Sequence, residues 1–129
     1  MIFDLSKMLF TLVTVATASA VPQRRQIEST ASCDFLLKPD VAVDPSSNLV
    51  SEFNFVIGHS LAIEVSPSSI TNGNATFFED ADAGTFLVHD DLAVDGKTAE
   101  ETAAILEGFV GQTKEGIAAN WLFQSVTCA

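Results

Sequence analysis

The middle of the chain alternates apolar and polar residues over a long stretch. In residues 52–57 every second side chain is large and apolar, and residues 61–65 continue the same parity. A period of two is typical of a strand with one buried face. The pattern therefore predicts two half-buried strands, joined by a tight turn or bulge at Gly58-His59-Ser60.

Shorter apolar runs predict the other strands. Pro, Gly, Asn and Asp, the residues that favour turns, occur between them along the chain. The runs cover residues 33–37, 75–79, 85–89 and 119–128, and residues 92–94 extend the sheet. Asn72-Gly73 is a strong hairpin cue, and residues 80–84 join the two runs on either side of them.

After residue 97 the period changes from two to that of a helix. Thr98 and Glu101 have the spacing of a capping box, in which each side chain bonds the other residue's backbone N–H. Ala99, Ala103 and Leu106 then follow helical spacing. Antiparallel strands with one main helix packed on them make an α+β domain.

The two cysteines stand near the ends of this pattern. Cys33 opens the first predicted strand and Cys128 closes the last. A pair of cysteines in a secreted chain predicts a disulfide, which would tie these two strands together. On the chain-entropy account, closing so long a loop stabilises the fold by about 4 to 5 kcal/mol.

The N-terminal residues have the features of a secretory leader. An apolar run at residues 8–18 follows Lys7 and ends at Ala18-Ser19-Ala20, a pattern that signal peptidase cuts after Ala20. The run is too short for a membrane anchor, which needs about 20 apolar residues, because Pro22 interrupts it. We therefore expect a signal peptide at residues 1–20.

Arg24-Arg25 resembles the dibasic site of kexin-type proteases of the fungal secretory route. Cleavage there removes a propeptide at residues 21–25 and leaves residues 26–129 as a single mature domain of 104 residues. That domain has 16 acidic residues and three lysines, for a net charge of −13. Such a surface repels phosphate backbones and anionic membranes, so a protein partner is expected rather than nucleic acid.

Residues 58–62 read Gly-His-Ser-Leu-Ala and resemble the nucleophile elbow of lipases, with Ala62 in place of the last glycine. A triad in the family's order would use Ser60, Asp80 or Asp82, and His89. The elbow requires a helix after the serine, whereas the alternation predicts a strand. A mature chain of this size is also too short for that fold. A serine hydrolase is therefore the alternative reading, and we expect no catalytic residue.

Two acidic segments are candidate cation sites. Residues 79–84 could gather carboxylates around Ca²⁺, but they lack the third acidic position of an EF-hand loop and favour a solvated hairpin tip. His89-Asp90-Asp91 is a thin transition-metal signal, because His59 is the only other histidine. We expect no metal and no cofactor.

Two further features concern the surface. Asn74 begins the sequon Asn-Ala-Thr, so in a secreted protein we expect it to carry an N-linked glycan. The alternative is an unmodified asparagine in a turn. Trp121 and Phe123 lie in the last predicted strand, which is apolar on both faces because Leu122 separates them. These aromatic residues belong either to the core or, where nothing covers them, to a contact face.

The leader, the Gln-Arg-Arg motif ending at Arg25, the cysteine pair and the C-terminal run from Asn120 to Cys128 together resemble the small secreted proteins of mushroom-forming fungi. The resemblance implies interaction with hosts or neighbours, or service as the small accessory subunit of a secreted laccase. It supplies no catalytic residues. We therefore expect a non-catalytic extracellular protein that binds another macromolecule, with a structural wall or matrix protein as a further alternative.

Overall fold

The protein, seen here in a computed structural model, is described over residues 29–129. The predicted signal peptide and the processing residues Ala20, Arg24 and Arg25 lie outside this range. The elements in chain order are β1 (Ala31–Pro39), α3 (Leu49–Val65), β2 (Ile70–Asn72), β3 (Thr76–Asp80), β4 (Thr85–Val94), α4 (Ala99–Glu107), β5 (Thr113–Glu115) and β6 (Asn120–Cys128).

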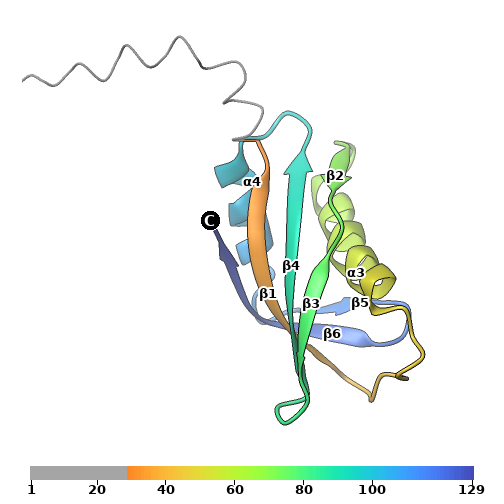
Figure 1. Cartoon of the computed structure of the whole chain (residues 1–129). Helices are drawn as coiled ribbons and strands as arrows, with labels where there is room; N and C mark the ends of the chain where they lie inside the picture. The colour runs from red at the N-terminus through yellow and green to blue at the C-terminus, as the bar shows by residue number, and fades with distance from the viewer. Residues whose placement is uncertain (1–28) are drawn as a thin grey trace, which may run out of the picture.

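The strands form one antiparallel sheet in the order β2-β4-β1-β6-β5, and β3 pairs with β4 on the same side as β2. The sheet curls, so that β5 and β6 run nearly across the direction of β1 and β4, and both helices lie behind it in Figure 1. The helices thus cover one face, which we call the inner face. The predicted α+β class is confirmed, with two helices in place of one main helix.

The principal correction concerns residues 52–65, which form helix α3 instead of two strands. Phe53, Ile57 and Leu61 alternate in the sequence but also lie four residues apart, so they form one buried stripe on a helix. Asn48 caps the helix by accepting a hydrogen bond from the Ser51 N–H at 3.1 Å. Because residues four apart also share one parity, the alternation fits a helical stripe as well as a strand, and that ambiguity made the strand prediction wrong.

Gly58 illustrates why α3 contains a residue that disfavours helices. A Cβ at this position would lie 2.5 Å from the amide nitrogen of Asn72, which itself donates to the Asn54 carbonyl at 3.0 Å. The glycine therefore lets β2 pack closely against the helix. The turn predicted at residues 58–60 does not exist. The Asn72-Gly73 cue is also not a hairpin, because β2 and β3 both pair with β4.

The predicted helix cap, the strands within residues 85–94 and the disulfide agree with the structure. Helix α4 begins after Thr98, whose hydroxyl accepts from the Glu101 N–H at 3.1 Å while Glu101 accepts from the Thr98 N–H at 2.9 Å. Residues 85–89 and 92–94 join into the single strand β4. Cys33 and Cys128 stand opposite each other on β1 and β6 and are disulfide-bonded, as predicted.

Trp121 and Phe123 are fully buried, so the candidate contact face on β6 is wrong and their place is the core. Trp121 packs edge-on against Phe53 of α3 with ring centroids 4.9 Å apart, and Phe123 packs against Phe35 at 5.9 Å. Helix α3 covers this face of β6, which the sequence alone did not establish. A bulge at Gln124, where the register with β1 shifts, allows Val126 to face inward as well.

One buried carboxylate joins α3 to the turn before β6. Glu52 accepts hydrogen bonds from the backbone N–H groups of Ile117 and Ala118 at 3.0 to 3.2 Å and from the Trp121 indole at 2.8 Å. Gly116 makes this approach possible, because a Cβ there would clash with the Glu52 carboxylate. A buried charge costs little only when several donors surround it, and this one has them.

We expect Glu52→Gln to lower the free energy of unfolding by about 2 to 3 kcal/mol, because an amide loses the charge and turns a donor toward N–H groups. Urea unfolding followed by Trp121 fluorescence measures the change. Glu64→Gln, at an exposed position of the same helix, is the matched control and should stay within about 0.5 kcal/mol of the parent. Equal losses in the two variants would contradict this role for Glu52.

Candidate functional site on the outer face of the sheet

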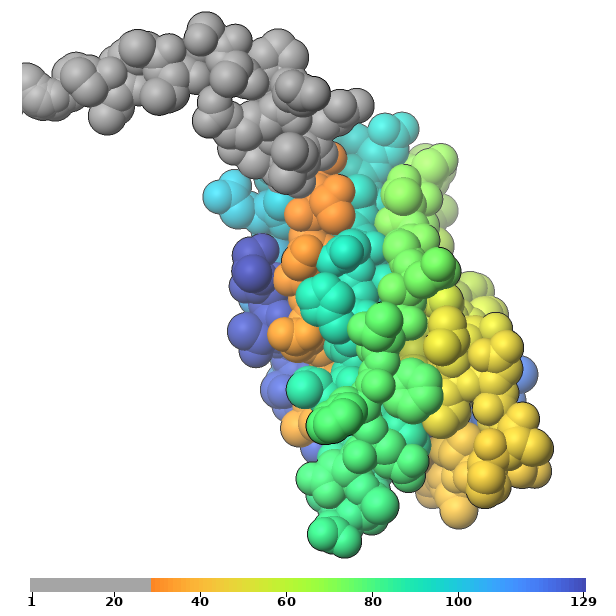
Figure 2. Space-filling model, viewed as in Figure 1, coloured from red at the N-terminus to blue at the C-terminus, as the bar shows by residue number. Residues whose placement is uncertain are grey.

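The face of the sheet opposite the helices presents a row of apolar side chains. Phe78 of β3 pairs with Leu87 of β4, and Leu87 pairs with Leu36 of β1. Their neighbours point the other way: Phe77 contacts the core ring of Phe53. We call Phe78, Leu87 and Leu36 the apolar row. Phe78 is 77% exposed and Leu87 46%, and Figure 2 shows the three strands side by side on this face.

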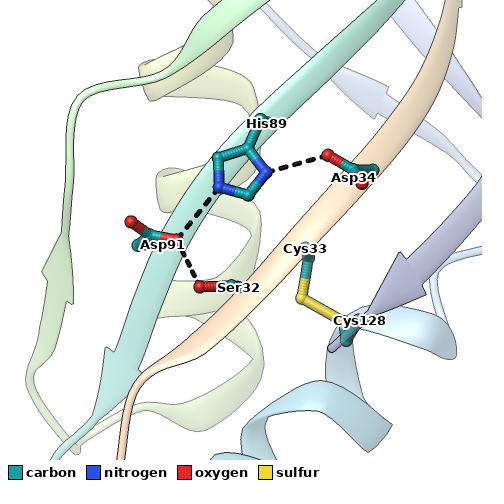
Figure 3. Close-up of polar contacts among 6 residues, drawn as sticks. All are labelled: Ser32, Cys33, Asp34, His89, Asp91 and Cys128. Atoms are coloured by element: carbon teal, nitrogen blue, oxygen red, sulfur yellow. Dashed lines mark hydrogen bonds and ion pairs between the residues drawn. A yellow bond between two sulfur atoms is a disulfide. The ribbon is translucent and has the colours of Figure 1, made fainter. Parts of the chain in front are cut away.

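Next to the apolar row, four polar side chains form a connected network (Figure 3). Asp34 and His89 are cross-strand partners, as are Ser32 and Asp91. The His89 Nδ1 lies 2.8 Å from an Asp34 carboxylate oxygen, and its Nε2 lies 3.2 Å from an Asp91 oxygen. The Ser32 hydroxyl donates to the same Asp91 oxygen at 2.6 Å. We call these residues the polar network.

In the polar network the His89 ring lies between the carboxylates of Asp34 and Asp91. The hydrogen bond with Asp34 raises the pKa of His89 above its ordinary value; burial opposes this rise, and the charges of Asp34 and Asp91 add to it. In the sequence, His89-Asp90-Asp91 is a weak candidate for a transition-metal site. The structure separates them, because His89 and Asp91 face outward and Asp90 faces inward.

Asp90 is the exception among the inward side chains of β4. It is 0% exposed, and neither carboxylate oxygen has a hydrogen-bond partner. It stands opposite Cys33 of β1, and on its own strand the inward neighbours are Val88 and Leu92. This burial raises the pKa of Asp90 to about 7, so at mildly acidic pH the side chain is a neutral carboxylic acid.

The structure does not bring together the residues of the alternative serine triad. Ser60 lies deep within helix α3 and is buried, so it does not stand on a turn from strand into helix. The residues after Ser60 form helix, so the strand predicted there is wrong. His59 stacks on Phe55 with ring centroids 4.8 Å apart, and His89 points away from the helices on the outer face.

The acidic segment 79–84 forms the connection of the β3–β4 hairpin, as predicted. Asp80 accepts a hydrogen bond from the Ala83 N–H at 3.2 Å, which shapes the turn. Within residues 29–129 no three His, Cys, Asp or Glu side chains are grouped so as to hold a metal ion. Asn74 is exposed in the link between β2 and β3, so its glycosylation remains a prediction at an accessible position.

Asp90 makes stability depend on pH with a definite sign. Its pKa is near 3.9 in an unfolded chain and about 7 in the folded protein, so between these values the folded state binds more protons. The contribution of Asp90 to stability is therefore greatest below ~pH 4 and is lost as the pH rises through 7, a loss of at most about 4 kcal/mol. His89 adds a smaller loss of the same sign.

Asp90→Asn should flatten this profile and make the variant more stable than the parent at ~pH 8, because no charge is then buried. Urea unfolding at several pH values provides the test. Asp82→Asn, an exposed aspartate in the β3–β4 turn, serves as the control and should leave the profile unchanged. If the free energy of unfolding of Asp90→Asn changes with pH as much as that of the parent, another group causes the pH dependence.

No helix in the part of the chain that the structure describes has the length and apolar character needed to cross a lipid bilayer. Comparison of the chain with family models, with curated proteins and with solved structures finds no match.

Proposed function

We propose that the protein is a secreted, non-catalytic domain that binds another extracellular macromolecule through the outer face of its sheet. The observation that carries the proposal is the apolar row, in which Phe78 is 77% exposed although the ring of its strand neighbour Phe77 contacts Phe53 of the core. Exposed aromatic side chains beside polar groups are typical of binding hot spots. The polar network supplies groups that can fix the orientation of a partner.

Secretion is supported by the leader pattern of the sequence and by the Cys33–Cys128 disulfide, a bond that persists in oxidising compartments. Within an extracellular setting, two roles fit a small binding domain of this kind. It acts as the accessory subunit of a secreted oxidase such as a laccase, or as an effector that contacts a host or neighbouring cell. Both roles need a rigid face that presents side chains, which the disulfide-tied sheet provides.

The binding face is tested by affinity capture from the culture fluid of the producing organism. The immobilised mature protein should retain a partner in a fixed stoichiometric ratio, and Phe78→Ser should lose it because the most exposed apolar side chain of the face is gone. Ile63→Ser is the matched control: Ile63 is 64% exposed but lies on α3, across the sheet from the outer face.

Circular dichroism of both variants verifies that the fold is intact. Loss of the partner in Phe78→Ser alone supports the outer face. A partner that survives Phe78→Ser, or a failure to capture any stoichiometric partner at low and moderate salt, would count against the proposal.

Processing and glycosylation are tested on the natively secreted protein. We expect an N-terminus at Gln26 and a mass above that of the polypeptide, which falls when the protein is treated with an N-glycosidase. Asn74→Gln should abolish the shift, because Asn74 is the exposed acceptor. An intact-mass spectrum that shows the leader still attached, or two thiols open to alkylation, would contradict the secretory proposal.

A further inference from the structure

His89 stands between two carboxylates and can satisfy both only when its ring carries two protons. A neutral imidazole has one N–H donor, and its other nitrogen is an acceptor. When that single proton lies on Nδ1, it serves Asp34 at 2.8 Å, and a lone pair on Nε2 then faces the Asp91 oxygen at 3.2 Å. Asp91 is left with the Ser32 hydroxyl as its donor within the network.

We propose that the outer face binds a cationic polypeptide segment with interspersed apolar side chains, and that His89 releases this segment in acid by taking Asp91 for itself. The proposal rests on the proposed function and adds to it the chemistry of the partner and the control of binding. A Lys or Arg of the partner would pair with Asp91, and the partner's apolar side chains would cover Phe78 and Leu87.

The charges around the network favour a cationic partner. On β1, Asp34 faces His89 directly, and Lys38 is further along the strand. On β3, Asp80 has the same parity as Phe78 and so belongs to the outer face. Strand β6, beyond β1, has no charged residue, and the whole chain has a net charge of −11. Carboxylates therefore outnumber cations on this face, and opposite charge favours association.

Acid should reverse the interaction by direct competition. The hydrogen bond with Asp34 and the two neighbouring charges raise the pKa of His89 above 6.5. The ring therefore gains its second proton at a higher pH than a free imidazole does. The imidazolium then donates to both carboxylates, and a partner cation would have to displace it. Binding should be stronger above this transition than below it.

The test uses a fluorescent peptide of alternating Lys and Leu, with alternating Glu and Leu as its counterpart, and the mature protein. Fluorescence anisotropy should show the Lys–Leu peptide binding about fivefold more tightly at ~pH 8 than at ~pH 5.5, the effect of one exposed ion pair. His89→Gln should bind with nearly equal affinity at both pH values. Asp91→Asn should bind weakly and without pH dependence, and the Glu–Leu peptide should not bind.

Two variants separate His89 from other groups that titrate in this range. His59→Gln, which changes the other histidine, and Asp90→Asn, which removes the buried carboxyl, should both keep the pH dependence of binding. Equal binding of the Glu–Leu peptide, a pH dependence that survives His89→Gln, or a dimer of this chain that Phe78→Ser dissociates would each overturn the proposal.

The two proposals fail in different ways. A partner that is captured through Phe78 while the Lys–Leu peptide does not bind leaves the proposed function in place and rejects only the cationic partner. A captured partner that survives Phe78→Ser rejects the binding face itself, whatever the peptides do.

Discussion

The pairing of β1 with strands on both of its edges is the constraint on which this structure depends. β1 lies between β4 and β6, and the disulfide joins it to β6 where Cys33 and Cys128 stand opposite each other. Because side chains alternate along a strand, fixing β1 fixes both faces of the sheet. Phe35 is thereby committed to the core, while Asp34 and Leu36 are committed to the outer face.

The parts of the fold that could be predicted are those with a local signal in the sequence. The short apolar runs of the strands, the capping box at Thr98 and the pair of cysteines each contain their own local signal, and the structure agrees with all three. Helix α3 has no such clear signal, because most of its apolar residues share one parity and also recur every four residues, a pattern that fits a helix as well as a strand. Its cap at Asn48 and the first-turn Glu52 were the available cues that the alternation obscured.

The candidate site was less predictable than the fold, for a physical reason. Asp34 and His89 are 55 residues apart, and they meet only because the β1–β4 register places them opposite each other. A one-residue slip would exchange the two faces, and no local pattern fixes a register to that accuracy. Trp121 likewise depends on a distant residue, because its buried indole N–H donates to the carboxylate of Glu52, which lies 69 positions away in the sequence.

Asp90 and His89 are adjacent in the chain but face opposite sides of the sheet, and this places two proton-binding groups on one strand. Both hold protons more tightly in the folded protein than in an unfolded chain, so each of them stabilises the fold more at acid pH. The same acid draws His89 onto Asp91 and so reduces the charge that the outer face offers to a partner. A partner that binds only the folded state would stabilise it by mass action at the higher pH, where the buried Asp90 weakens it. Binding and the stability that these two groups contribute would then be greatest at opposite ends of the same pH range, because a single strand supplies the proton sites for both.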